Sequence, residues 1–168
     1  TFSFYPNKHI TTGEGGMVLT NDENLAERCR SLRNLCFKKE QRFIHEDIGW
    51  NYRMTNLQAA LGVAQLEQIG SFIKRKREIG ALYNNQLMHI DCISLMPTAV
   101  PYADNIFWVY GILVNDDYPK NAENIMNELK KYNIGSRPFF YPMHLQPVLN
   151  NMGLFITEKY PVAEKLAE

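Results

Sequence analysis

A single lysine, Lys8, stands between an aromatic run that contains a proline and a glycine-rich turn. Residues 1–8 read Thr-Phe-Ser-Phe-Tyr-Pro-Asn-Lys, and residues 13–16 are Gly-Glu-Gly-Gly. A lysine amine becomes a nucleophile toward carbonyl groups when desolvation or a nearby cation removes its proton. It is also the side chain that can form an imine with an aldehyde. Two interpretations are open: a surface lysine beside a hairpin turn, or a catalytic amine.

Other polar side chains are candidates for binding. Ser3 precedes Lys8 by five residues, and Asn51 lies in the run Gly-Trp-Asn-Tyr-Arg-Met-Thr. Arg137, Tyr141 and His144 share the run Arg-Pro-Phe-Phe-Tyr-Pro-Met-His, in which the arginine is suited to bidentate contact with a carboxylate or diphosphate. Each has a structural alternative: a capped turn at Ser3, a turn before a helix at Asn51, and a buried, hydrogen-bonded histidine at His144.

The pattern Ser-Phe-x-x-x-Lys-x-x-x-x-Gly-Glu-Gly-Gly resembles the pyridoxal-phosphate lysine segment of the DegT/DnrJ/StrS sugar aminotransferases. The run Gly-Trp-Asn-Tyr-Arg-Met-Thr-Asn-Leu-Gln-Ala-Ala, residues 49–60, resembles the second signature of the same family. Two long motifs in the right order make the resemblance specific, and it extends nearly end to end. The residues around Lys8 are most similar to those of the perosamine synthase branch.

The resemblance implies a role for each candidate. Lys8 would hold pyridoxal 5'-phosphate covalently and then move a proton as general base and general acid. Ser3 would hydrogen-bond the cofactor phosphate in the same subunit. Asn51 would reach the phosphate of a neighbouring subunit, so that a complete site needs a homodimer. The run 137–144 would contact glutamate or the nucleotide sugar.

The reaction expected from the resemblance moves an amino group from glutamate to a nucleotide-linked 4-keto-6-deoxy sugar. A sugar dehydratase of the same fold is one alternative, although that branch has histidine in place of the lysine. Here Lys8 is present and His9 only follows it. A catalytically inactive fragment that acts as an oligomerisation or binding module is another, because the part of the family's large domain before the lysine is expected to be missing.

The composition bears on other function classes. Eighteen basic and eighteen acidic residues give a net charge of zero, which offers no electrostatic support for binding nucleic acid or an anionic membrane. No apolar run approaches the roughly 18 residues of a membrane helix. The three cysteines are Cys29, Cys36 and Cys92, and their odd number and spacing argue against a disulfide framework or a metal site. A reduced, cytoplasmic setting is expected.

The hydrophobic pattern predicts how Lys8 and Asn51 are positioned. A strand at residues 2–4 should lead into the lysine loop, and a second strand at residues 17–20 should return from it. Asn21 or Asp22 should cap the next helix. Thr55 should cap a mostly apolar helix that kinks or restarts at residues 70–71 and continues to residue 87.

A change in composition near residue 88 indicates two domains in an α/β protein. By resemblance, residues 1–87 are the C-terminal part of a large domain of fold type I, including the long helix. Residues 88–168 are a small α+β domain, incomplete at its end, with strands at 90–95 and 106–114 and a third extended run at 136–141. Asn121 should begin its helix and Gly135 should end it, and a last helix should cover residues 158–167.

Overall fold

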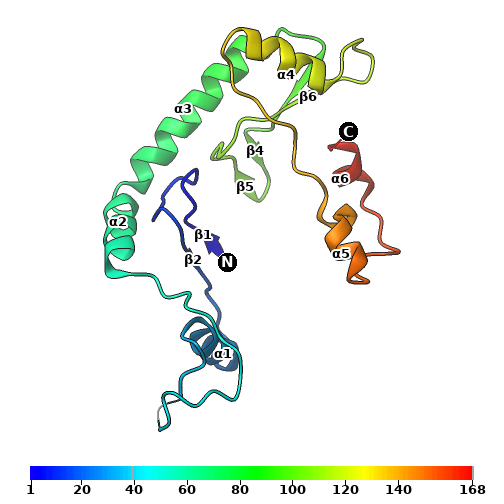
Figure 1. Ribbon diagram of the computed structural model, residues 1–168. Helices are drawn as coiled ribbons and strands as arrows, with labels where there is room; N and C mark the ends of the chain where they lie inside the picture. Colours follow the sequence, from blue (N-terminus) through cyan, green and yellow to red (C-terminus); the bar gives the residue numbers. More distant parts are fainter. Residues whose placement is uncertain (39, 168) are drawn as a thin grey trace. The chain divides into compact units, whose positions relative to one another are not determined.

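The computed structural model describes residues 1–38 and 40–167 (Figure 1). The chain divides into two compact units, Thr1–Arg77 and Glu78–Glu168. The long helix α3 (Ile69–Leu87) runs from the first unit into the second. The domain boundary that the composition predicts, at residue 88, lies just past the C-terminal end of this helix.

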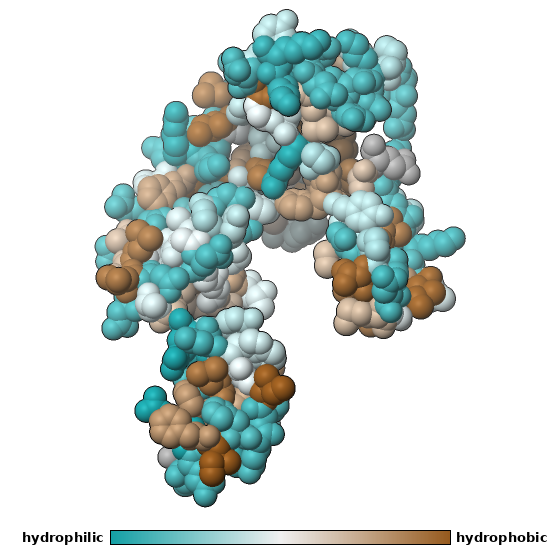
Figure 2. All heavy atoms as spheres, viewed as in Figure 1, coloured by the Kyte–Doolittle hydropathy of each residue, from teal (hydrophilic) through white to brown (hydrophobic). Residues whose placement is uncertain are grey.

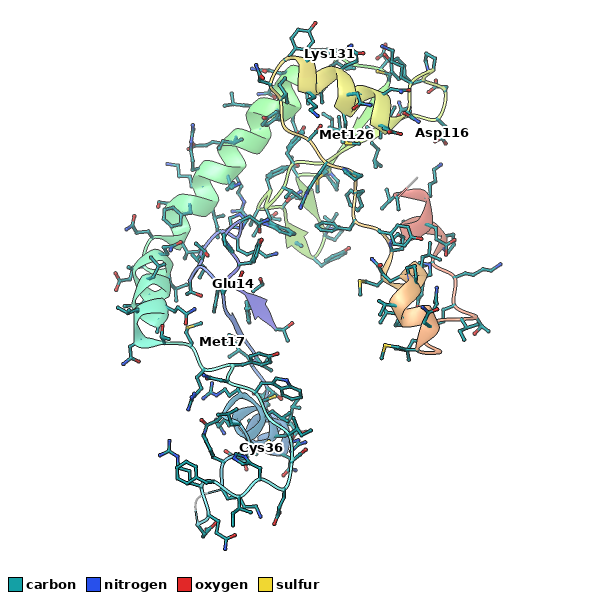
Figure 3. All side chains as sticks on the ribbon, in the orientation of Figure 1. Glu14, Met17, Cys36, Asp116, Met126 and Lys131 are labelled. Carbon is teal, nitrogen blue, oxygen red and sulfur yellow. The ribbon has the colours of Figure 1, made fainter. Side chains whose placement is uncertain are left out.

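The first unit begins with a short hairpin that frames Lys8. Strand β1 (Phe2–Ser3) pairs antiparallel with β2 (Gly16–Met17), with Phe2 opposite Met17 and Ser3 opposite Gly16. The returning strand is therefore shorter than the residues 17–20 expected from the sequence. The twelve residues between the two strands form a loop with its own hydrogen bonds, and Figure 3 labels Glu14 within it.

Local capping explains where the helices of the first unit begin. Helix α1 (Glu23–Arg33) starts at Asp22, whose Oδ1 accepts from the Leu25 N–H at 3.1 Å. Helix α2 (Asn56–Leu66) starts at Thr55, which forms a capping box with Gln58. Both caps confirm the sequence predictions. The interruption before α3 falls at residues 67–68, three residues earlier than predicted.

The second unit contains two small antiparallel pairs. Strand β3 (Ile93–Leu95) pairs with β6 (Ile112–Val114), and β4 (Ala99–Val100) pairs with β5 (Ala103–Asp104). The β4–β5 hairpin lies where the sequence suggested only a connection. The extended run expected at residues 136–141 joins no strand pair among the described residues.

Helix α4 (Ala122–Lys131) starts at its predicted cap, Asn121, whose Oδ1 accepts from the Asn124 N–H at 3.0 Å. The prediction that Gly135 ends this helix is wrong. Asn133 adopts a left-handed φ of 60°, and the next N–H, that of Ile134, donates to the Leu129 carbonyl at 3.1 Å. This is a Schellman ending with asparagine in the usual place of glycine.

Three short helical segments complete the chain, η1 (Met143–Leu145), α5 (Pro147–Asn151) and α6 (Pro161–Lys165). The last is shorter than the residues 158–167 expected. Among the described residues, the buried hydrophobic side chains are Cys36 in the first unit and Phe107 in the second. Figure 2 shows hydrophobic surface on both units. Among the described residues, no helix has the length and apolar character needed to cross a membrane.

Candidate active site: the lysine loop and its support

The lysine loop, defined here as residues 4–15, has its two ends, called the neck below, joined by hydrogen bonds to Phe4. The Phe4 N–H donates to the Gly15 carbonyl at 2.9 Å. The Phe4 carbonyl accepts twice, from the Thr12 N–H at 3.0 Å and from the Thr11 hydroxyl at 2.8 Å. These three bonds hold the outgoing and returning arms of the loop together, so the loop is a structured unit around Lys8.

Within the loop, Lys8 belongs to a tight turn and is partly buried. Its N–H donates to the Tyr5 carbonyl at 3.0 Å, and Pro6, inside the turn, fixes its own φ. On the returning arm, Thr12 is only 5% exposed, and its hydroxyl donates to the Glu14 carbonyl at 2.8 Å. The buried threonine thus anchors the arm that returns from Lys8 to β2.

Helix α2 holds the loop from one side through two glutamine side chains. Gln65 contacts the backbone of Thr11 twice: its Oε1 accepts from the Thr11 N–H at 3.1 Å, and its Nε2 donates to the Thr11 carbonyl at 2.8 Å. Gln58 Nε2 donates to the Glu14 carbonyl at 3.1 Å. The amide of Gln65 therefore pairs with Thr11 as a neighbouring strand would.

Gly62 lies between the two glutamines on the same face of α2, because residues four and three apart line up along a helix. A Cβ at Gly62 would lie 2.9 Å from the Thr12 Cγ2. The sequence interpretation singled out the aliphatic residues of this helix and missed its glutamines. The signal that could have found them is the spacing of Gln58, Gly62 and Gln65 along an otherwise apolar helix.

Ser3 lies on β1, at the entrance to the lysine loop, and is exposed. Its hydroxyl oxygen accepts from the Tyr5 N–H at 3.4 Å, a local contact that fits the capped-turn alternative. The same hydroxyl can donate its hydrogen to a phosphate oxygen, because a serine hydroxyl both donates and accepts. Ser3 and Lys8 thus belong to one hairpin, and the phosphate role stays a prediction.

Asn51, also in the first unit, lies on an extended segment beside the end of α1. It forms a β-bridge with Asn34, and its Oδ1 accepts from Arg53 Nε at 3.0 Å. Arg53 also donates from Nη1 to the Asn34 Oδ1 at 2.9 Å. Arg53 therefore fixes the orientation of the Asn51 amide, and the predicted contact with a cofactor phosphate would use its Nδ2.

The remaining candidates lie in the second unit. The Arg137 guanidinium stands 5.0 Å from the ring centroid of Phe140, a cation–π distance, and Phe140 stacks on Trp108 at 6.1 Å. Tyr141 is 56% exposed. These two side chains are placed to meet solvent or a ligand, and their substrate role stays a prediction.

His144 differs from its neighbours because it is buried, with 6% of its surface exposed. Its Nε2 lies 2.8 Å from the Glu164 Oε1, which also accepts from the Tyr160 N–H at 2.9 Å. The Tyr160 N–H, and then His144, hold the pKa of the Glu164 carboxyl below its usual range. The structure thus matches the alternative of a buried, hydrogen-bonded histidine, and contact of His144 with substrate stays a prediction.

The part of the chain that the structure describes contains no group of three or more His, Cys, Asp or Glu residues placed to hold a metal ion. Over residues 1–168 the sequence matches the DegT/DnrJ/EryC1/StrS aminotransferase family. The chain belongs to this family.

Relatives and solved structures agree with this membership. The chain is 40% identical over 166 residues to GDP-perosamine synthase of Escherichia coli O157:H7, covering 99% of this chain and 43% of that protein. It is 36% identical over 149 residues to EpsN of Bacillus subtilis, named a putative pyridoxal phosphate-dependent aminotransferase, covering 89% of this chain and 38% of that protein. The chain thus spans about two fifths of the length of the curated relatives that it matches.

Among solved structures, PseC of Helicobacter pylori, an aminotransferase in the biosynthesis of pseudoaminic acid, matches with a TM-score of 0.81 at 28% identity. The match covers 99% of this chain and 44% of PseC. The chain therefore has the fold of the corresponding portion of a sugar aminotransferase, and its recognition from the two sequence motifs is confirmed.

Proposed function

We propose that this chain is part of a pyridoxal phosphate-dependent sugar aminotransferase and that Lys8 is its catalytic lysine. The observation that carries the proposal is the lysine loop itself. Lys8 stands at the family's spacing, and its loop is closed at Phe4 and docked on α2 through Thr11. A surface lysine beside an ordinary turn needs neither the closed neck nor the pair of glutamine hydrogen bonds.

The side chains of the first unit fit this cofactor chemically. Lys8 is partly buried and supplies a primary amine for the aldehyde. Ser3 supplies a hydroxyl and Asn51 an amide N–H group, both good donors to phosphate oxygens. When bound, pyridoxal phosphate supplies the electron sink that stabilises negative charge at the substrate carbon.

The residues of the chain then have separate tasks. Lys8 Nζ would accept a proton from the reacting carbon of the amino donor in the first half of the reaction, and would donate a proton to the reacting carbon of the keto acceptor in the second half. The Ser3 hydroxyl donates to the phosphate in its own subunit. Asn51 Nδ2 donates to the phosphate held by a neighbouring subunit, which makes the functional enzyme a homodimer with shared sites.

For the substrates, we propose glutamate as amino donor and a nucleotide-linked 4-keto-6-deoxy sugar as acceptor, in a cytoplasmic enzyme. Similarity to GDP-perosamine synthase supports a perosamine-like product. Arg137 and Tyr141 are the candidates for contact with the diphosphate or the donor carboxylate, since arginine binds both in bidentate fashion. In this proposal residues 1–87 belong to the large domain of a fold-type I transferase, and residues 88–168 belong to its small C-terminal domain.

The test uses the full-length protein that contains this chain. Treatment with borohydride should fix the cofactor on Lys8, and peptide mass spectrometry should find the added mass there. Lys8→Ala should abolish both the visible absorbance band and the glutamate-dependent amination of a panel of nucleotide-linked keto sugars. Lys8→Arg is the control that retains the positive charge without forming the bond. Wild-type protein that shows no visible band after incubation with the cofactor would overturn the proposal.

A further inference from the structure

We infer that Gln65, together with Gln58 and Gly62, forms a docking face on α2 that positions the catalytic amine of Lys8. The inference rests on the proposed function, because it concerns how that amine is held. None of these three residues needs to touch the cofactor or the substrate. Their role is to hold the backbone of the lysine loop, so they are positioning residues.

The first step of the argument is the place of Thr11. It follows Lys8 by three residues, and its hydroxyl is one of the donors that close the loop on the Phe4 carbonyl. Gln65 holds the same residue by both its N–H and its carbonyl. Two antiparallel hydrogen bonds fix distance and orientation together, so a shift of Thr11 relative to α2 breaks both at once.

The second step is the close approach at Thr12. The side chain of this buried threonine meets Gly62 of α2, where a Cβ would lie 2.9 Å from its Cγ2. It also meets Gly15, whose φ is +148° and whose Cβ would lie 2.7 Å from the Thr12 Oγ1. A side chain at either glycine would displace Thr12, and with it the arm that returns from Lys8.

The third step is the consequence for catalysis. The glutamine amides carry no charge and do not titrate, so they influence Lys8 only by fixing the position of the loop. An amine that attacks an aldehyde and later moves a proton must be aligned with both partners, and a displacement of about 1 Å can cost about a hundredfold in rate. The docking face therefore controls the reaction through the position of the loop.

The decisive variant is Gln65→Met in the full-length protein, because methionine keeps the length of the side chain and removes both hydrogen bonds. We expect hydrogen exchange in a peptide spanning Thr11 to rise, the pH midpoint of the visible band of the lysine-bound cofactor to shift, and kcat to fall about tenfold or more. Gln68→Met is the matched control: Gln68 is exposed, lies three residues along the chain, and should leave all three readouts unchanged.

A second pair of variants covers the case in which Gln65→Met does not fold. Gly62→Ala leaves every hydrogen bond of the glutamines chemically possible and adds only a methyl group against Thr12. We expect it to shift the midpoint of the visible band as well. Gly70→Ala makes the same change in a helix where a Cβ meets nothing within 4 Å, and it should shift nothing.

The readouts separate failure of this inference from failure of the proposed function. If the wild-type protein lacks the visible band, the proposed function fails, while hydrogen exchange still reports whether Gln65 docks the loop. The inference is overturned if hydrogen exchange at Thr11 rises in Gln65→Met while the pH midpoint of the visible band is unchanged and kcat stays within about twofold of the wild type. It is also overturned if Gln65→Met leaves exchange unchanged, or if Gly62→Ala leaves the midpoint of the band where the wild type has it.

Discussion

The lysine loop of the first unit and the aromatic cluster of the second unit, defined as Tyr83, Phe107 and Tyr110, are held by different forces. The loop is held by amide side chains that pair with backbone groups, as at Gln65 and Thr11. In the cluster, the rings of Tyr83 and Tyr110 stack at 4.6 Å, and Phe107 is 6% exposed. Hydrogen bonds fix direction and apolar burial stabilises the fold, so the first region is built for position and the second for stability.

Both regions use a glycine of a helix to let another segment approach. At Gly62 a Cβ would meet a threonine methyl group at 2.9 Å, and at Gly80 it would meet three atoms of the Phe107 ring at 2.5 to 2.7 Å. A ring cannot withdraw as a small methyl group can. The comparison therefore predicts that substitutions in the cluster reduce stability, whereas substitutions at the loop change function first.

The largest effect is expected at Phe107. Replacing it with alanine removes the ring that fills the space above Gly80 and should lower the free energy of unfolding by about 3–5 kcal/mol. Phe107→Leu should cost less, because part of the apolar surface remains. Urea denaturation measures both. Hydrogen exchange at Thr11 should stay at the wild-type level, and a rise there would break the proposed division between the two regions.

The next effect is expected at Gly62, and it should appear in function rather than in stability. Alanine raises helix propensity by roughly 0.5–1 kcal/mol but pushes against Thr12. We therefore expect a Tm equal to or above that of the wild type together with about a tenfold lower kcat, equivalent to about 1.4 kcal/mol in the activation free energy. Gly70→Ala is the control. A fall in Tm without loss of kcat would reverse the comparison.

A smaller effect is expected at Tyr110, whose hydroxyl ties the cluster to helix α3. Its hydroxyl donates to the Asn84 Oδ1 at 2.5 Å, and burial, followed by the nearby Tyr83, raises the pKa of Tyr110. Tyr110→Phe should cost about 1 kcal/mol in the free energy of unfolding, the usual net value of one hydrogen bond. Tyr102→Phe, at a tyrosine that is 89% exposed, should cost nothing measurable.

The smallest effect concerns the contact between His144 and Glu164, a polar contact inside the second unit. Because the folded pKa of Glu164 lies below its ordinary value of 4.5, this carboxylate stabilises the fold above pH 4.5, and the contribution disappears as the pH falls through the folded value. Glu164→Gln should flatten that part of the stability curve. Thermal unfolding between pH 6 and pH 3 measures this pH dependence. If Tm falls with pH equally steeply in the variant and the wild type, Glu164 does not make the proposed contribution.

Local signals predicted much of this molecule. The caps at Asp22, Thr55 and Asn121 follow from side chains that accept from the N–H three residues on, so the sequence alone contains the information. The spacing around Lys8 and the second motif led to the family for a similar reason, because each motif is continuous in the sequence.

Contacts between distant segments could not be predicted in the same way. Gln65 and Thr11 are separated by 54 positions, and nothing in either segment alone identifies the other as its partner. The end of α4 was misplaced for a different reason: both Asn133 and Gly135 tolerate a left-handed backbone, and the contact that selects between them is the bond from Ile134 to Leu129.

The uncharged character of the Gln65 amide has a consequence for how such an enzyme would respond to its medium. The hydrogen bonds of an uncharged amide do not change in strength with ionic strength or pH as an ion pair would. Any acid or alkaline limb in the rate profile would then originate in the reactants and the groups that touch them, and the scaffold beneath Lys8 would keep the same shape across the whole range.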